Sequence, residues 1–169
     1  LHGMTMNGAL LVECVIWLII SARFNCLMPK IKQLDSEQNI EGKRVLLRVD
    51  FNVPLDNDSI TEDSRIQKVL PTIKSLIDKK AKVIIISHLG RPKGKIVPGL
   101  TLKPIAKKLS GYLNQNVTFL DKNIGEDVIQ KSKQIPNGKV LLLENLRFCK
   151  EEELNDDSFA KDLSKNGDI

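Results

Sequence analysis

Hydrophobic and polar residues follow two kinds of pattern between residue 44 and the end of the chain. Short runs rich in β-branched apolar residues predict strands that are buried on both faces. Between these runs, apolar residues recur every three or four positions, which predicts helices with one apolar face. Strands that alternate with helices are typical of an α/β fold, a parallel sheet with helices on both faces. The predicted strands are residues 44–51, 82–87, 117–120 and 139–144.

Four helices are expected between and after these strands. Two have apolar residues at identical spacings, which places those residues on one face. A third is expected to end before the turn-forming sequence Pro136-Asn137-Gly138. The fourth is expected to begin at a cap formed by Asn155 or Asp156. The predicted helices are residues 66–77, 102–113, about 124–132, and a last one ending at Lys165; the alternation then predicts another strand at 167–169.

Local signals at the two longer helices suggest how they begin. Thr61 and Thr101 are the expected N-caps, because a hydroxyl oxygen can accept a hydrogen bond from a free backbone N–H. Glu62 and Asp63 are expected in the first turn, where the helix dipole favours negative charge. Pro71 either kinks the first helix or opens a second one at its first position.

Residues 1–27 differ in composition from the rest of the chain. They contain the only Trp and a single acidic and a single basic residue. Their apolar run, residues 9–20, is shorter than the about 20 residues that span a membrane, so no membrane association is expected. A secretory signal and a buried helix are alternatives, but an upstream extension is favoured, because Met28 reads as a natural start. We therefore expect an extension over 1–27 and the folded domain over 28–169.

Composition narrows the class of protein. With 41% apolar residues, the chain is too apolar to be disordered. The three cysteines are odd in number and not spaced as metal ligands, which favours a reducing compartment, and we expect a cytoplasmic protein. The formal net charge of +5 fits several kinds of partner, so the positions of the charges decide.

Several kinds of chemistry are excluded by spacing. No G-x-G sequence is present, so the dinucleotide fingerprint is missing. The segment 90–95 resembles a phosphate-binding loop, but it has three residues between its glycines where that motif has four, and Ile96 stands where Ser or Thr is required. Aromatic residues are not interleaved with a basic stripe, so no nucleic-acid binding is expected.

Polar residues follow three of the predicted strands at the point where each ends. In open parallel sheets, ligands bind outside the carboxyl ends of the strands. The sequences there are residues 50–54, 88–94 and 144–148, and Arg65 follows the first of them closely. His88, Arg65, Arg91 and Arg147 would then gather at one edge. A planar guanidinium holds phosphate or carboxylate through paired hydrogen bonds, so this grouping predicts a site for an anion.

Each of these residues also has a purely structural interpretation. Asp50 could only turn the chain, and Asn52 could start a turn. His88 could be a hydrogen-bonded structural histidine. Arg65 and Arg147 could pair with Glu62 and Glu144 at the surface. Their joint placement at three strand ends favours the site, whereas the lysine clusters fit solvated helix faces and Cys149, with no adjacent base, fits a passive residue.

Four segments resemble the N-terminal domain of phosphoglycerate kinases, in the order and spacing of that family: residues 48–54, 63–66, 87–94 and 143–148. The resemblance covers about residues 28–169. It implies a Rossmann-like domain that holds 3-phosphoglycerate or 1,3-bisphosphoglycerate, while a second domain holds Mg-ADP or Mg-ATP and a hinge closes the two for phosphoryl transfer. On this resemblance the domain is expected to be incomplete at its C-terminal end and the nucleotide domain to be absent.

The resemblance also implies roles for individual residues. Arg65 would be the catalytic arginine. Asp50 and Asn52 would contact the glycerate, and His88, Arg91 and Arg147 would bind its phosphate and carboxylate. The full set of expected substrate-binding residues is Asp50, Phe51, Asn52, Arg65, His88, Leu89, Gly90, Arg91 and Arg147.

Further expectations follow from the absent nucleotide domain. No nucleotide or metal is expected to bind this chain, which is expected to be inactive alone, and the family is typically monomeric. A free-standing Rossmann-like module that binds a phosphorylated small acid is the alternative.

Overall fold

A four-stranded parallel sheet forms the centre of the fold in the computed structural model, which describes residues 39–56 and 59–169. The strands are β1 (Arg44–Arg48), β4 (Lys82–Ile86), β5 (Val117–Leu120) and β6 (Val140–Leu143), in the spatial order β1-β4-β6-β5. All three pairings are parallel. The predicted α/β fold is thus confirmed, while the boundary expected after residue 27 lies outside the described residues.

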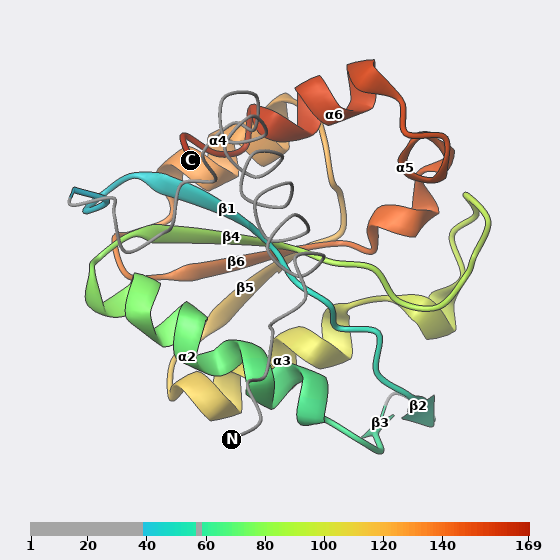
Figure 1. Cartoon of the computed structure of the whole chain (residues 1–169), viewed down its shortest axis with the longest axis horizontal. Helices are drawn as coiled ribbons and strands as arrows, with labels where there is room; N and C mark the ends of the chain where they lie inside the picture. The colour runs from blue at the N-terminus through green and yellow to red at the C-terminus, as the bar shows by residue number, and fades with distance from the viewer. Residues whose placement is uncertain (1–38, 57–58) are drawn as a thin grey trace, which may run out of the picture. The chain divides into compact units, whose positions relative to one another are not determined.

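Helices cover both faces of this sheet (Figure 1). Helices α2 (Ser64–Asp78) and α3 (Lys103–Leu113) pack on one face, and α4 (Glu126–Gln134) and α6 (Asp157–Ser164) lie on the other. The other helical segments in the described residues are a short helix, α5 (Lys150–Glu153), and two 3-10 turns, η2 (Pro98–Leu100) and η3 (Leu146–Phe148). Within the described residues, no helix is long and apolar enough to cross a membrane.

The two central strands are buried on both faces. On the face of α4 and α6, alternate strand residues form one cluster with Val128 and Phe159. The residues between them are equally inaccessible, which explains why these strands read as continuous apolar runs. The cluster members from β4 and β6 are Ile84, Ile86, Leu141 and Leu143, and the intervening buried residues are Val83, Ile85, Val140 and Leu142.

The first strand ends three residues earlier than predicted. Beyond Arg48, the hydroxyl of Ser87 takes the place of a regular ladder: it accepts a hydrogen bond from the Phe51 N–H at 3.0 Å and donates one to the Val49 carbonyl at 2.9 Å. Asp50 then turns the chain, because its Oδ1 accepts a hydrogen bond from the Asn52 N–H at 3.0 Å. Apolar composition alone could not reveal this serine contact.

The expected N-caps of the two longer helices are wrong. Helix α2 has Asp63 at its N-cap, and the Thr61 hydroxyl donates instead to the Pro54 carbonyl. Helix α3 begins at Lys103 with Leu102 at its N-cap; the Thr101 hydroxyl accepts a hydrogen bond from the Lys103 N–H at 3.3 Å, and the Leu102 N–H donates at 2.9 Å to the buried carboxylate of Glu144. The start of α3 is therefore bonded by the Thr101 hydroxyl and by a carboxylate of the β6 strand end together.

Other boundaries differ more mildly from the predictions. Pro71 lies inside α2, which is a single helix, so the possibility that Pro71 opens a second helix is wrong. Glu62 and Asp63 precede the first turn. Helix α6 begins, as one alternative predicted, at an Asp156 cap, whose carboxylate accepts from the Phe159 N–H. The sequence patterns missed α5 and a two-stranded antiparallel pair of β2 (Leu55–Asp56) and β3 (Ser59–Ile60), both too short to show periodicity.

Residues 167–169, which were predicted to form a strand, are not a regular strand but make a single parallel pairing with β1. The Ile169 N–H donates to the Arg44 carbonyl at 3.2 Å, and the Leu46 N–H donates to the Ile169 carbonyl at 2.8 Å, which is the hydrogen-bond pattern of a parallel ladder. Asp168 forms an ion pair with Arg44 at 2.6 Å, and this contact lowers the pKa of the Asp168 carboxyl. These bonds place the last residues along the free edge of β1.

Asp63 links the start of α2 to α3. Its Oδ2 accepts a hydrogen bond from the Tyr112 hydroxyl at 2.5 Å and lies 2.9 Å from Nζ of Lys108, while Gln67 donates to Oδ1. These donors, the Tyr112 hydroxyl first, lower the pKa of Asp63 from 3.8 to about 2. The carboxylate therefore stabilises the folded state at neutral pH.

This contact predicts a pH-dependent loss of stability. Because the folded state lowers the pKa of Asp63, its contribution is complete above pH 3.8 and is lost as the pH falls toward about 2. Asp63→Asn should unfold at lower urea concentration than the parent chain at pH 7, and the difference should shrink below pH 3.8. Asp121→Asn, at an exposed carboxylate, is the control. A difference for Asp63→Asn that stays constant across the pH range would contradict the prediction.

Candidate functional site

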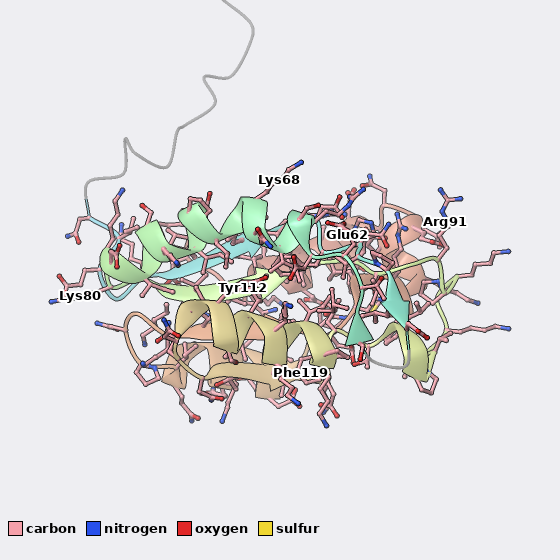
Figure 2. The ribbon with its side chains drawn as sticks, turned by 90° about the horizontal axis from the view of Figure 1, so that it is seen from below. Glu62, Lys68, Lys80, Arg91, Tyr112 and Phe119 are labelled. Atoms are coloured by element: carbon pink, nitrogen blue, oxygen red, sulfur yellow. The ribbon has the colours of Figure 1, made fainter. Side chains whose placement is uncertain are left out.

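Three loops follow the neighbouring strands β1, β4 and β6 at the carboxyl edge of the sheet. We name them the β1 loop (residues 49–54), the β4 loop (87–97) and the β6 loop (144–149). Figure 2 shows Arg91 of the β4 loop reaching outward at this end of the molecule, with Lys80 at the opposite end. The three sequence segments expected to form the site thus lie side by side.

The buried side chain of Asn145 joins the β6 loop to the β4 loop. Its Oδ1 accepts hydrogen bonds from the N–H groups of Leu89 and Arg147, both at 3.1 Å. Its Nδ2 donates to the carbonyls of Leu89 at 2.7 Å and Leu100 at 2.9 Å. A primary amide has two donors and an oxygen with two acceptor positions, so Asn145 is fully bonded. It therefore fixes the backbone of the β4 loop next to His88 and the backbone of the β6 loop at Arg147.

The peptide groups around Gly90 are held from both sides. Asn52 Oδ1 accepts a hydrogen bond from the Gly90 N–H at 2.9 Å, and Arg147 Nη1 donates to the Gly90 carbonyl at 2.8 Å. Gly90 has a φ of 63°, and a Cβ here would collide with the side chain of Leu100. All three loops therefore meet at one glycine, directly before Arg91.

The cations of the site differ in what holds them. Arg65, at the start of α2, forms an ion pair with Asp50 of the β1 loop. Arg147 is bonded to Gly90 as described. Within the described part of the chain, the exposed Arg91 side chain forms no hydrogen bond or ion pair. In the alternative interpretation, Arg65 and Arg147 would pair with Glu62 and Glu144. In the described residues Arg65 instead forms its ion pair with Asp50, and the Glu144 carboxylate is bonded to Thr101 and Leu102.

His88 lies among several charged side chains. Burial of its ring and the neighbouring Arg147 guanidinium lower the pKa of His88, against the opposite effect of Asp50 and Glu152. The imidazole is therefore mainly neutral at pH 7, and it can donate one hydrogen bond and accept one. Positive charge at the site thus comes from the arginines.

A carboxylate of α5 completes the constellation. Glu152 Oε1 accepts a hydrogen bond from Arg48 Nη2 at 2.8 Å, and its Oε2 lies 3.8 Å from Arg147 Nε. Arg48 is the last residue of β1, so this contact connects α5 to the edge where the three loops meet. The arrangement presents cations and neutral donors to an anion, with two carboxylates that offset part of the charge.

Comparison with known proteins identifies the family to which this arrangement belongs. A family model described as phosphoglycerate kinase matches residues 34–169. The chain belongs to the phosphoglycerate kinase family. The match covers all three loops of the candidate site.

Individual relatives agree with this assignment. The phosphoglycerate kinase of Rippkaea orientalis is 54% identical over 134 residues, which are 79% of this chain and 34% of that protein. That of Borreliella afzelii is 49% identical over 139 residues, 82% of this chain and 35% of that protein. The chain therefore spans about a third of the length of the curated relatives it matches.

Solved phosphoglycerate kinases share the fold. The structure from Coxiella burnetii matches with a TM-score of 0.70 and 41% identity, over 79% of this chain and 33% of that one. The structure from Pyrococcus horikoshii matches with a TM-score of 0.72 and 36% identity, over 82% of this chain and 35% of that one. The sheet and its flanking helices are thus those of the phosphoglycerate kinase family.

The residues implied by the family resemblance fall into two groups in the structure. Asp50, Asn52 and Gly90 join Arg65, His88, Arg91 and Arg147 around the three loops. Phe51 and Leu89 are instead buried, at 0% and 2% exposure, and their N–H groups are bonded to Ser87 and Asn145. These two residues position the loops through the core.

Four residues that shape the site were not among the expected site residues: Arg48, Ser87, Asn145 and Glu152. A signal for Asn145 existed, because a polar residue two positions after a continuous apolar strand has to satisfy its amide when it is buried. No comparable signal existed for Glu152, which lies between two other glutamates on a short charged helix. Only the tertiary structure brings it to Arg48.

Loss of the Asn145 amide should destabilise the loops strongly. Asn145→Ala leaves two N–H groups and two carbonyls without their partner, and each unsatisfied buried group costs about 1–3 kcal/mol. We expect the free energy of unfolding to fall by at least about 3 kcal/mol, measured by urea denaturation. Asn116→Ala, at an exposed asparagine, should change it by less than about 0.5 kcal/mol. Equal losses in both variants would show that the amide does not hold the loops.

Proposed function

We propose that the three loops bind the acid substrate of a phosphoglycerate kinase, 3-phosphoglycerate or 1,3-bisphosphoglycerate. The observation that carries the proposal is the junction at Gly90, where Asn52 and Arg147 bond the same residue from two different loops. This junction fixes the backbone before Arg91 and keeps the cations of three strand ends together. Membership in the family supports the identity of the ligand.

The chemistry of the side chains suits the parts of this ligand. The guanidinium groups of Arg91 and Arg147, with the neutral His88 ring, offer N–H donors to phosphate and carboxylate oxygens. Asn52 uses its oxygen on Gly90, which leaves its NH₂ group to donate to the ligand. Asp50 can accept a hydrogen bond from a glycerate hydroxyl. Each polar part of the acid thus has a partner of matching character.

Arg65 is the residue that we assign to the transfer step. In the direction that forms the acyl phosphate, a carboxylate oxygen of the acid attacks the terminal phosphorus of a nucleoside triphosphate, and the bond from that phosphorus to the nucleotide's bridging oxygen breaks. Phosphoryl transfer depends on alignment and on stabilising charge more than on covalent participation of the protein. The ion pair with Asp50 holds Arg65 beside a proposed glycerate contact, where its charge can stabilise the transferring group.

The proposal concerns the acid substrate alone. Within residues 39–56 and 59–169, no group of three His, Cys, Asp or Glu side chains is arranged to hold a metal ion. We assign no nucleotide site to these residues. In the family resemblance, that site belongs to the second domain.

Arg91 gives the cleanest test of this site. Because its exposed side chain forms no hydrogen bond or ion pair within the described part of the chain, Arg91→Ala should leave stability unchanged and remove only ligand contacts. Hydrogen bonds to a charged group contribute about 1.5–3 kcal/mol, so 3-phosphoglycerate should bind at least roughly tenfold more weakly in a calorimetric titration.

The matched control is Lys68→Ala, which removes one exposed cation from α2 (Figure 2). It should bind 3-phosphoglycerate like the parent chain. Equal weakening in both variants would show that binding follows overall charge, and unaltered binding in Arg91→Ala would place the ligand elsewhere. Equal affinity for unrelated phosphorylated acids would favour a general binding module over a kinase site.

A further inference from the structure

Glu152 is a poorly solvated carboxylate placed between two arginines of the candidate site. Its side chain is 13% exposed, and it bonds Arg48 Nη2 at 2.8 Å while lying 3.8 Å from Arg147 Nε. Interactions between partly buried charges are screened much less than those on the surface. The negative charge of Glu152 therefore acts on both arginines.

Arg147 is left with unused hydrogen-bonding capacity. A guanidinium has five N–H donors, and one is used by Nη1 on the Gly90 carbonyl. Its Nε atom is buried and has no hydrogen-bond partner in the described residues, since 3.8 Å is too long for such a bond. Glu152 thus compensates the charge of Arg147 through space without using its remaining Nη donors, which stay available to another anion.

The charge of Glu152 also acts on His88, which is one of the proposed ligand contacts. The charged groups that act on the His88 ring come from three elements: Arg48 and Asp50 at the end of β1, Arg147 in the β6 loop, and Glu152 in α5. The two arginines lower the pKa of His88 and the two carboxylates raise it. Glu152 and Arg147 therefore act with opposite sign on the same donor.

We propose that Glu152 is a positioning residue whose negative charge sets the anion affinity of the site. It holds Arg48 and offsets part of the positive charge of Arg147, so a phosphate-bearing acid binds more weakly than the arginines alone would bind it. This weaker binding lets a multiply charged acid leave again after reaction. The inference rests on the proposed function, because the anion whose affinity is set is the proposed substrate.

The test separates the charge of Glu152 from its shape. Inorganic phosphate and 3-phosphoglycerate are titrated into the chain while the ring resonances of His88 are followed by NMR. Glu152→Gln keeps the shape and removes the charge, Glu152→Asp keeps the charge, and Glu153→Gln removes the charge of an exposed neighbour on the same helix. Thermal unfolding of each variant establishes that it is folded.

Glu152→Gln should bind both anions between about three- and tenfold more tightly, since removing a nearby like charge lowers the repulsion of the ligand. The pKa of His88 should fall in this variant, because Glu152 raises it in the parent chain. The gain in affinity should shrink as salt is added. Glu152→Asp and Glu153→Gln should stay close to the parent chain in both measurements.

Two failures are distinguishable. If phosphate moves the His88 resonances but Glu152→Gln binds equally or more weakly, the inference is wrong and the proposed function stands. The same holds if Glu152→Asp changes affinity as much as Glu152→Gln, since geometry and not charge would then matter. If neither anion moves the His88 resonances in any variant, the proposed function is wrong and this inference with it.

Discussion

The fully bonded amide of Asn145 is the contact on which the arrangement of the loops depends. It lies two residues after the last residue of β6, at 0% exposure, and its four hydrogen bonds reach the β4 loop, η2 and its own loop. The carboxylate of the neighbouring Glu144 accepts hydrogen bonds from the Thr101 hydroxyl and from the N–H of Leu102, the N-cap of α3. The hydrogen bonds of these two consecutive polar residues thus hold loops with little regular structure in fixed positions next to the sheet. Such contacts are specific because an unsatisfied buried polar group is so unfavourable.

Residues at the site therefore serve two purposes at once. Asn52 and Arg147 are proposed ligand contacts, yet both also bond Gly90 and hold the loops together. Weaker ligand binding after substitution of either residue would combine a lost contact with a displaced loop. Arg91 lacks this second role, because it projects from the loop that the other residues hold. The hydrogen bonds distinguish residues that hold the loops from residues that would only contact the ligand, and the sequence alone does not show this difference.

The alternation of apolar runs was sufficient to predict the parallel sheet, the central strands and the two-sided cover of helices, because burial on both faces requires continuous apolar sequence. The rule that ligands bind at the carboxyl edge of a parallel sheet was likewise sufficient to predict that Asp50, His88, Arg91 and Arg147 lie near one another. Prediction failed where a distant side chain replaced a local signal, as Ser87 does at the end of β1. It also failed for elements too short for periodicity, such as α5. Glu152 was missed for both reasons, since its short helix has no pattern and its partner lies 104 positions away in the sequence.

The net charge of +5 explains little of the proposed anion site, because many of the cations are exposed lysines away from the strand ends, such as Lys43, Lys68 and Lys74. What distinguishes the arginines at the strand ends is the way in which their charge is compensated. Arg65 and Arg48 each face a carboxylate, Arg147 is bonded to a neutral carbonyl with Glu152 at a distance, and Arg91 has no described partner. An arriving phosphate gains most from donors that are positioned but not yet neutralised, and least from those already in an ion pair. The pattern of partial compensation, more than the number of cations, therefore determines where an anion binds.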